Sequence, residues 1–209
     1  GDMTIENFKN NGVITDYIQT VDESSGVAPI WVDESGQNRI IVIPGANDLI
    51  DGSLAIEALE NIGKPHVLVG QFEIPMNVNE QVFSYAYKNG VETVLNPAPA
   101  NKPSDILLQN TSWFIPNEIE FEEIYGDIFN ENNLLLFAKN LDTNVVVTLG
   151  EKGCAYIKNN SVKIIKEPEI TVKEYARGAN VQPQDLDDED FTLTIDKANY
   201  FAFKIDDIE

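Results

Sequence analysis

The sequence predicts an α/β protein built on a parallel β-sheet, and three observations support this fold class. From residue 53 to residue 150, segments with helical spacing alternate with short apolar segments, which is typical of βαβ units. The apolar segments, of which residues 144–150 (NVVVTLG) are the richest in β-branched side chains, have the composition of strands buried on both faces. Hydrophobic residues make up 43% of the 209 residues and charged residues 23%, as in soluble globular proteins.

One helix and one β-hairpin are predicted in the first fifty residues. Residues 4–11 have helical spacing and end before Gly12, which can adopt the left-handed conformation that ends a helix. Residues 26–32 (GVAPIWV) and 39–44 (RIIVIP) are rich in strand-forming side chains and flank a polar turn that contains glycine. These two segments are predicted to pair as a hairpin.

The middle of the chain is predicted to form four helices and four strands. The helices show amphipathic spacing and the strands are short and apolar. In chain order these elements are helix 53–62, strand 66–70, helix 78–89, strand 91–96, strand 112–115, helix 117–125, helix 132–140 and strand 144–150.

The last fifty residues follow a different pattern. After two predicted strands at 154–158 and 161–165 come an irregular polar stretch and the acidic run 185–190 (DLDDED). Apolar side chains alternate with polar ones over residues 191–205, which predicts a second β-hairpin. The change predicts an α/β region at residues 1–160 and an acidic, β-rich appendage at residues 161–209.

Charge and cysteine content argue against several classes of function. The chain has 35 acidic and 14 basic residues, and its net charge of −21 would repel nucleic acids and anionic membranes. No stretch approaches the roughly 20 apolar residues of a membrane helix, and the first residues show no signal-peptide pattern, so we expect a cytoplasmic protein. The single cysteine, Cys154, cannot form an intrachain disulfide and is expected to be a small buried strand residue.

Polar turns that contain glycine or proline follow four of the predicted strands. Ligands of open parallel sheets bind beyond the carboxyl ends of the strands, so these turns predict a shared ligand cleft. They lie at residues 70–73, 96–100, 116–120 and 148–153.

Three positions in these turns have alternative interpretations. In residues 148–153 two glycines allow backbone amides to approach an anion and Thr148 can donate to a phosphate, although an ordinary tight turn has the same pattern. Asn117 and Glu120 either face an anion at a helix start or form a capping box. Glu73 either accepts hydrogen bonds from sugar hydroxyls or is an exposed loop residue.

Two further features favour structural interpretations. His66 is the only histidine, begins an apolar strand and has no nucleophile at a suggestive spacing, which favours a core or edge residue over a catalytic base. The acidic run 185–190 lacks the glycine and the terminal glutamate of an EF-hand loop, which favours a solvated loop over a calcium site.

Five segments, taken in order, resemble the ribokinase family of carbohydrate kinases. They are GVAPIWVDESGQNRIIVIPGAN (26–47), GQFEIP (70–75), VLNPAPA (94–100), IPNEIEFEEIYG (115–126) and VVVTLGEKGC (145–154). The resemblance covers residues 1–160 and implies a parallel, Rossmann-like sheet of ribokinase type, here incomplete, with the β-hairpin as a lid. It also implies an ATP-dependent enzyme that phosphorylates ribose or a related sugar hydroxyl.

The resemblance implies roles for the residues of the strand-end turns. Its ligands would be ATP with magnesium and a sugar, and the oligomeric state, including a homo-oligomer, is left open. Glu73 would contact the sugar, Glu120 would help to organise magnesium, and the alanine-proline run 96–100 would line the cleft. ATP would be bound by Asn117, Thr148, Leu149, Gly150, Glu151, Lys152 and Gly153.

The chain departs from the family pattern at both ends. It begins where the middle of such a kinase would, without the glycine-rich GGKGAN-type sugar motif, and no DTTGAGD-type motif follows Ile165. The glycines of that second motif form an anion hole and its aspartate is the catalytic base, so no catalytic residue is assigned and no useful kinase activity is expected from these residues alone.

Residues from 161 onward instead resemble a segment of tailed-phage major capsid proteins. Two alternatives to a kinase therefore stay open. One is a structural or assembly protein, and the other is a binding module for nucleotide or sugar that does not catalyse a reaction.

Overall fold

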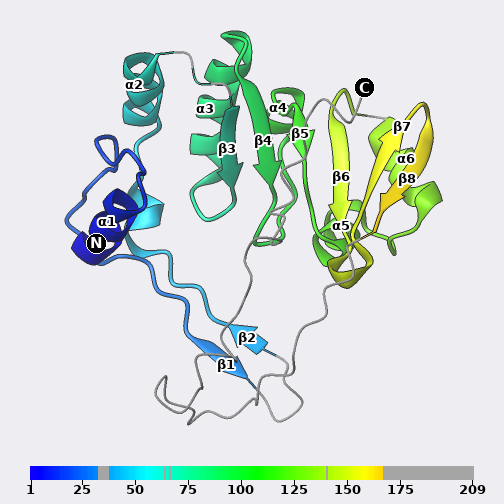
Figure 1. The fold of residues 1–209 in the computed structure, drawn as a ribbon, viewed down its shortest axis with the longest axis horizontal. Coiled ribbons are helices and arrows are strands. Elements are labelled where there is room, and N and C mark those ends of the chain that lie inside the picture. Colours follow the sequence, from blue (N-terminus) through cyan, green and yellow to red (C-terminus); the bar gives the residue numbers. More distant parts are fainter. Residues whose placement is uncertain (33–37, 64, 66, 140, 167–209) are drawn as a thin grey trace, which may run out of the picture. The chain divides into compact units, whose positions relative to one another are not determined.

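The computed structural model of the chain describes residues 1–32, 38–63, 65, 67–139 and 141–166, all of which belong to one compact unit (Figure 1). The predictions for His66, for the acidic run 185–190 and for the hairpin at 191–205 lie outside the described residues. So does nearly all of the capsid-like segment, whose assignment stays a prediction.

A helix and a two-stranded hairpin form the N-terminal part, as predicted. Helix α1 (Asp2–Asn10) is followed by Gly12 with a φ of 76°, in the left-handed region that ends a helix. Strands β1 (Ile30–Val32) and β2 (Asn38–Ile40) pair antiparallel with Ile30 opposite Ile40. Two further hydrogen bonds of 2.9 Å join the backbones of Val27 and Ile43 and extend the hairpin toward its base.

A six-stranded sheet in the order β3-β4-β5-β6-β7-β8 confirms the predicted α/β class. Its first four strands are parallel to one another, and the last two run antiparallel to their neighbours. The strands are β3 (Val67–Gln71), β4 (Glu92–Asn96), β5 (Trp113–Phe114), β6 (Asn144–Thr148), β7 (Cys154–Lys158) and β8 (Ser161–Ile165). Residues 161–165 thus belong to the sheet, while the proposed division of the chain at residue 160 stays a prediction.

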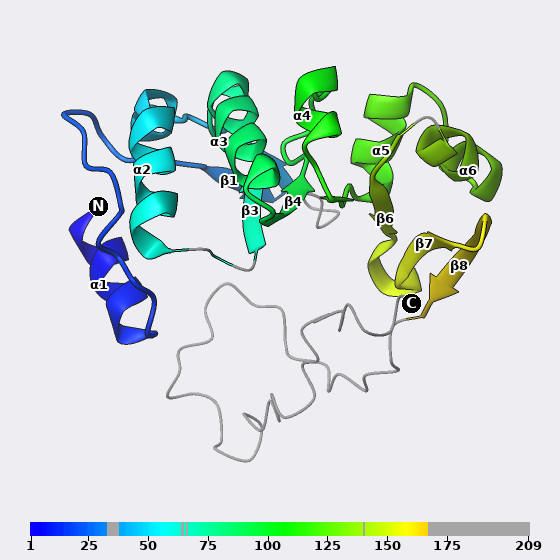
Figure 2. The same cartoon turned by 90° about the horizontal axis from the view of Figure 1, so that it is seen from above.

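Helices α2 to α6 lie on one face of this sheet (Figure 2). The side chains of Asp51 and Ser104 accept hydrogen bonds from backbone N–H groups in the first turns of α2 and α4, which explains where these helices begin. The helices are α2 (Gly52–Ile62), α3 (Met76–Lys88), α4 (Asp105–Gln109), α5 (Glu118–Tyr125) and α6 (Glu131–Lys139). Helix α4 and the short 3₁₀ helix η1 (Gly45–Leu49) were not expected from the sequence.

The hydrophobic core lies between this helix layer and the sheet. Apolar side chains from both layers are almost completely buried there, including Phe83, Leu95, Phe114, Phe121 and Leu134. Gly70 in β3 allows the close approach of α3, because a Cβ at this position would lie 2.5 Å from the Phe83 ring. The core therefore fixes the helices, and with them the loops at the carboxyl ends of the parallel strands.

The prediction that the strands are buried on both faces is confirmed for β6 and is wrong for β3. Val145, Val146 and Val147 are all buried, as the apolar run predicted. In β3, by contrast, Val67 is 41% exposed and Val69 is 69% exposed. The reason is that β3 is the edge strand of the sheet, and helices α2 to α6 lie on the face opposite to Val67 and Val69.

Cys154 is 2% exposed at the start of β7, which confirms a buried strand residue. Burial raises the pKa of its thiol, and the thiolate is the reactive form. We expect a thiol-specific disulfide reagent at pH 8 to modify the native chain at least about 100-fold more slowly than the urea-unfolded chain. Equal rates in the two states would show that this end of β7 opens freely.

Among the described residues, no helix combines the length and the apolar character needed to cross a membrane.

Candidate functional site

The loops that follow β5 and β6 lie side by side at the carboxyl ends of the parallel strands. Asn117 follows β5 and forms a parallel β-bridge with Thr148, the last residue of β6. The Thr148 amide donates a hydrogen bond of 2.9 Å to the carbonyl oxygen of Pro116. Two segments that the sequence analysis assigned to one ligand, Asn117 and residues 148–153, are therefore neighbours in the structure.

Asn117 and Glu120 form a reciprocal capping box at the start of α5. The Asn117 Oδ1 accepts the Glu120 N–H, and the Glu120 Oε2 accepts the Asn117 N–H, each at 2.8 Å. This confirms the capping interpretation that the sequence left open. It also fixes the helix N-terminus, with its partial positive charge, next to the turn after β6.

Residues 148–153 form a tight turn that contains the 3₁₀ helix η2 (Gly150–Lys152). Gly150 has a φ of 58° and Gly153 a φ of 95°, values that glycine adopts without a steric penalty. Within the turn, the Leu149 amide donates a hydrogen bond to the Gly153 carbonyl oxygen, and the Gly153 amide donates one to the Gly150 carbonyl oxygen. The turn is therefore held by its own hydrogen bonds, which leaves the Thr148 hydroxyl and the Lys152 ammonium group as its side-chain donors.

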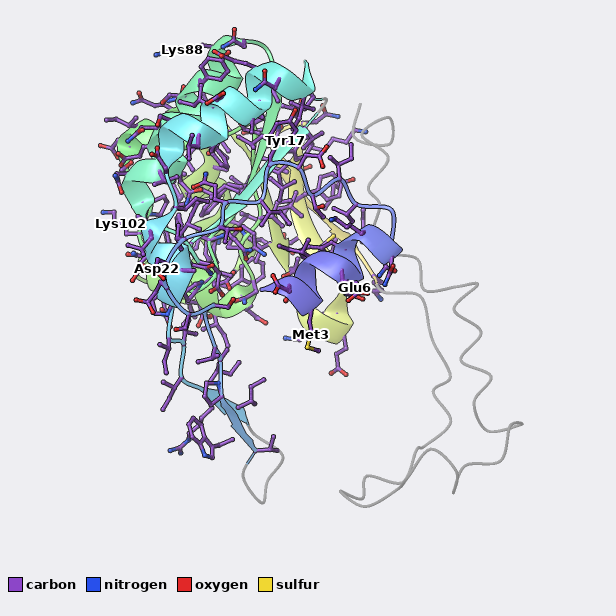
Figure 3. All side chains as sticks on the ribbon, turned by 90° about the vertical axis from the view of Figure 1, so that its left-hand side faces the viewer. Met3, Glu6, Tyr17, Asp22, Lys88 and Lys102 are labelled. Carbon is purple, nitrogen blue, oxygen red and sulfur yellow. The ribbon has the colours of Figure 1, made fainter. Side chains whose placement is uncertain are left out.

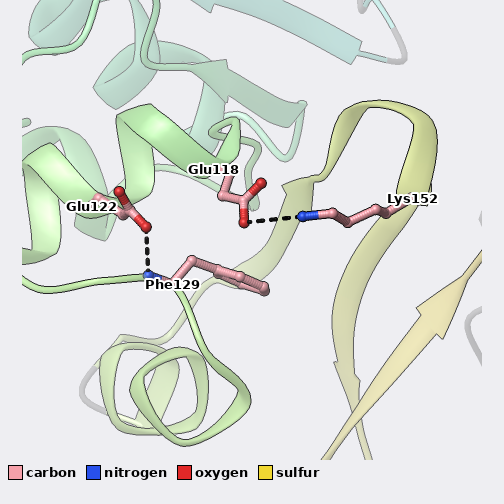
Figure 4. Close-up of polar contacts among 4 residues, drawn as sticks. All are labelled: Glu118, Glu122, Phe129 and Lys152. Atoms are coloured by element: carbon pink, nitrogen blue, oxygen red, sulfur yellow. Dashed lines mark hydrogen bonds and ion pairs between the residues drawn. The ribbon is translucent and has the colours of Figure 1, made fainter.

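Lys152 is the positive charge of this turn (Figure 4). Its Nζ lies 3.8 Å from the Glu118 Oε1, and the two side chains are 67% and 38% exposed, so the pair stabilises the fold little. The second contact drawn in Figure 4 joins the Glu122 Oε1 to the Phe129 N–H at 2.9 Å and fastens the end of α5 to the chain that follows it. An ammonium group so weakly held can reorient toward a phosphate.

Three carboxylates lie near this turn and would repel an anionic ligand. Glu118, Glu120 and Glu151 add negative charge there, so a bound polyphosphate would need a cation to offset the repulsion between its own charge and these carboxylates. Within the described part of the chain, no three acidic, histidine or cysteine side chains are grouped to hold a metal ion. A magnesium ion here would take most of its ligands from phosphate and water, with one or two carboxylates, which is its usual coordination.

Glu73 lies in a separate cleft of about 640 Å³ between the start of α1, the loop after it and the base of the hairpin. Figure 3 looks onto this side, where α1 carries Met3 and Glu6 and the following loop carries Tyr17 and Asp22. The polar side chains of the cleft are acidic, amide or hydroxyl groups, and no lysine or arginine is among its described lining. They include Asp2, Thr4, Gln19, Thr20, Glu23, Asn47 and Glu73.

Such a lining suits a neutral, hydroxylated ligand better than an anion, because carboxylates and amides accept hydrogen bonds from hydroxyls and repel negative charge. The Phe72 N–H donates to the Ala98 carbonyl at 2.9 Å, so the alanine-proline run 96–100 adjoins the loop that carries Glu73. Gln19, Thr20 and Asn47 were not singled out from the sequence. They lie in loops, where no periodic pattern distinguishes them.

Together, the fold and these two sites define a class of protein. It is an α/β protein with one candidate ligand site at the carboxyl ends of its parallel strands and a second one at the base of its β-hairpin. The model of the pfkB family carbohydrate kinases matches residues 1–174. The chain belongs to the pfkB family, and its similarity is to the ribokinase-like members.

Two curated relatives illustrate the similarity in sequence. The deoxyribokinase of Salmonella typhi is 33% identical over 163 residues, which cover 75% of this chain and 53% of that protein. The ribokinase of Bacillus subtilis is 34% identical over 157 residues, which cover 75% of this chain and 52% of that protein. The chain spans about half the length of the curated relatives it matches.

Solved structures show the same fold. A ribokinase from Thermotoga maritima matches 83% of this chain and 58% of its own chain with a TM-score of 0.68 and 29% identity. The Arabidopsis thaliana ribokinase in complex with ribose and ATP matches 75% of this chain and 52% of its own, with a TM-score of 0.61 and 28% identity.

Proposed function

We propose that the chain is part of a ribokinase-like kinase that transfers a phosphoryl group from ATP to a hydroxyl of ribose or a related sugar. The observation that carries this proposal is the bridge between Asn117 and Thr148, which sets the N-terminus of α5 beside a glycine turn. Helix N-termini and glycine turns bind phosphates through backbone amides and a favourable dipole. A relative that binds both ribose and ATP supports this assignment.

The proposal assigns a role to each predicted site residue. Asn117 and residues 148–153 (Thr148, Leu149, Gly150, Glu151, Lys152 and Gly153) bind ATP, with the Thr148 hydroxyl and the Lys152 ammonium group directed to its phosphates. Glu120 orients a magnesium ion through water or phosphate oxygen while it caps α5. Glu73 accepts hydrogen bonds from the sugar in the acidic cleft. The protein acts in the cytoplasm on small molecules.

We also propose that these 209 residues bind their ligands without useful turnover. The sequence contains no DTTGAGD-type motif, which in the family supplies the anion hole and the catalytic base. We give neither role to any other described residue. Phosphoryl transfer depends on positioning and electrostatic stabilisation by such groups. Ribose-dependent release of ADP is therefore expected to stay far below a kinase rate of about 1 per second. A turnover of that order would contradict this part of the proposal.

Calorimetry with Mg-ATP tests the nucleotide site. Lys152→Gln removes the positive charge of the turn, and we expect it to weaken Mg-ATP binding about three- to tenfold, since an exposed charge-assisted contact contributes roughly 1 kcal/mol. Lys163→Gln removes the same charge from β8 and should leave the affinity unchanged. Equal losses in the two variants would mean that only net charge matters, and absence of binding to the unaltered chain would refute the nucleotide site.

A further inference from the structure

Glu73 lies in a short loop between β3 and α3 (Figure 1), and a buried asparagine from α3 contacts this loop. The loop consists of residues 72–75, all of which are half-buried. Its position decides where the Glu73 carboxylate lies in the acidic cleft. The asparagine is Asn79, which is 2% exposed and has no role in the two candidate sites described above.

Asn79 contacts both ends of this loop. Its Nδ2 donates a hydrogen bond of 2.8 Å to the carbonyl oxygen of Gln71, the last residue of β3. Its backbone N–H donates one of 3.4 Å to the carbonyl oxygen of Pro75, the N-cap residue of α3. Asn79 therefore joins the residue before the loop to the residue that ends it.

The surroundings of Asn79 explain why an amide is buried here. Gly70 lets the carboxamide lie close to β3, because a Cβ at Gly70 would be 3.1 Å from the Asn79 Oδ1. An apolar side chain such as leucine would fill the same space with no polar atom to satisfy, whereas a buried amide costs free energy unless it is hydrogen-bonded. The bond to Gln71, and not packing, accounts for an asparagine at this position.

The charge of the acidic cleft gives the loop a reason to be restrained. Asp2 and Glu23 line the same cleft as Glu73, and carboxylates that share a cleft repel one another. An unrestrained loop would turn the Glu73 carboxylate away from its neighbours and into water. The bond from the Phe72 N–H to the Ala98 carbonyl restrains the loop from the side of β4, and Asn79 restrains it from α3.

We propose that Asn79 is a positioning residue for the sugar, because it holds the loop that directs the Glu73 carboxylate into the cleft. Asn79 is not among the described residues that line this cleft, so it acts through Glu73 and not on the ligand. The inference rests on the proposed function, which assigns the sugar contact to Glu73.

Calorimetry with ribose on the full chain tests the proposal. Asn79→Leu removes the amide donor at similar volume, and we expect it to weaken ribose binding about tenfold, because the loop loses a bond at its start. The affinity for Mg-ATP should stay unchanged. Asn79→Ala removes the same bond without adding bulk beside Gly70 and should give the same loss, which separates the lost bond from overpacking.

Thr111→Val is the matched control. Thr111 is 1% exposed, and its Oγ1 donates a hydrogen bond of 2.8 Å to the Leu107 carbonyl, outside both candidate sites. The variant therefore removes a buried bond of the same kind, from a side chain to a backbone carbonyl, at similar volume. It should leave the ribose affinity unchanged, and a loss equal to that of Asn79→Leu would overturn the proposal.

A double-mutant cycle separates positioning from a merely structural role. Glu73→Gln should itself weaken ribose binding about tenfold, since an amide replaces a charged acceptor. In this background Asn79→Leu should cost less than about a further twofold, because the loop then carries no carboxylate to position. Independent losses that multiply in the double variant would contradict positioning, as would an unchanged affinity in Asn79→Leu when Glu73→Gln binds more weakly.

Hydrogen exchange of the Phe72 amide tests the restraint without a ligand. We expect exchange at least about tenfold faster in Asn79→Leu than in the unaltered chain, with unchanged exchange of the β6 amides. Unchanged exchange at Phe72, or equal acceleration in β6, would overturn the proposal. Failure of ribose to bind the unaltered chain, or equal binding to Glu73→Gln, would count against the proposed sugar contact, while the exchange rates still decide whether Asn79 holds the loop.

Discussion

Replacing Phe121 by alanine is expected to lower the free energy of unfolding by about 3–5 kcal/mol, the cost of deleting a large buried aromatic side chain. Phe121 is completely buried in α5, and its ring centroid lies 5.4 Å from that of Tyr125, 5.6 Å from that of Phe129 and 5.4 Å from that of Phe137. The substitution leaves a cavity and removes three aromatic contacts. Urea denaturation followed by circular dichroism measures the change.

Ile119→Ala is the matched control, because Ile119 lies two residues away in the same helix and is 66% exposed. Its cost should stay below about 1 kcal/mol, since most of its apolar surface already contacts water. A loss below about 1 kcal/mol for Phe121→Ala as well would contradict a well-packed aromatic cluster. The comparison matters for function because α5 carries the capping box beside the proposed nucleotide site.

Much of the secondary structure was predictable because its elements are long enough to show a period. Strands 154–158 and 161–165 have the predicted bounds, and the valine run of β6 is buried on both faces. Helix α4 has only five residues, fewer than two turns, so no helical period could indicate it. The exposure of β3 was also unpredictable, because an apolar segment does not specify which strands and helices flank it.

For the candidate site, the sequence identified which loops carry polar residues, and the structure shows which of these loops lie next to one another. Asn117 and Thr148 could be placed at strand ends, but their β-bridge depends on β5 and β6 being adjacent in the sheet. The acidic cleft around Glu73 combines α1, a loop and the base of the hairpin. Contacts among three such segments depend on tertiary packing, which leaves no local signature in the sequence.

Replacing Asn117 by aspartate is expected to preserve the stability of the chain and to weaken Mg-ATP binding at least about tenfold. Aspartate is as good an N-cap as asparagine and its charge interacts favourably with the helix dipole, so the free energy of unfolding should change by less than about 0.5 kcal/mol. A carboxylate about 4 Å from a phosphate is repelled by roughly 4 kcal/mol at a surface dielectric of about 20, and a third of this repulsion suffices for a tenfold loss.

Asn117→Ser separates the two contributions, because serine caps a helix without adding charge. Under the proposed function its affinity for Mg-ATP should fall less than that of Asn117→Asp, at equal stability in urea denaturation. Unchanged affinity in both variants would show that Asn117 only caps α5 through its bond to the Glu120 N–H. The capping box and the nucleotide contact are compatible in the unaltered chain, because the cap uses Oδ1 and leaves the amide donors of the Asn117 side chain for a phosphate or the adenine base.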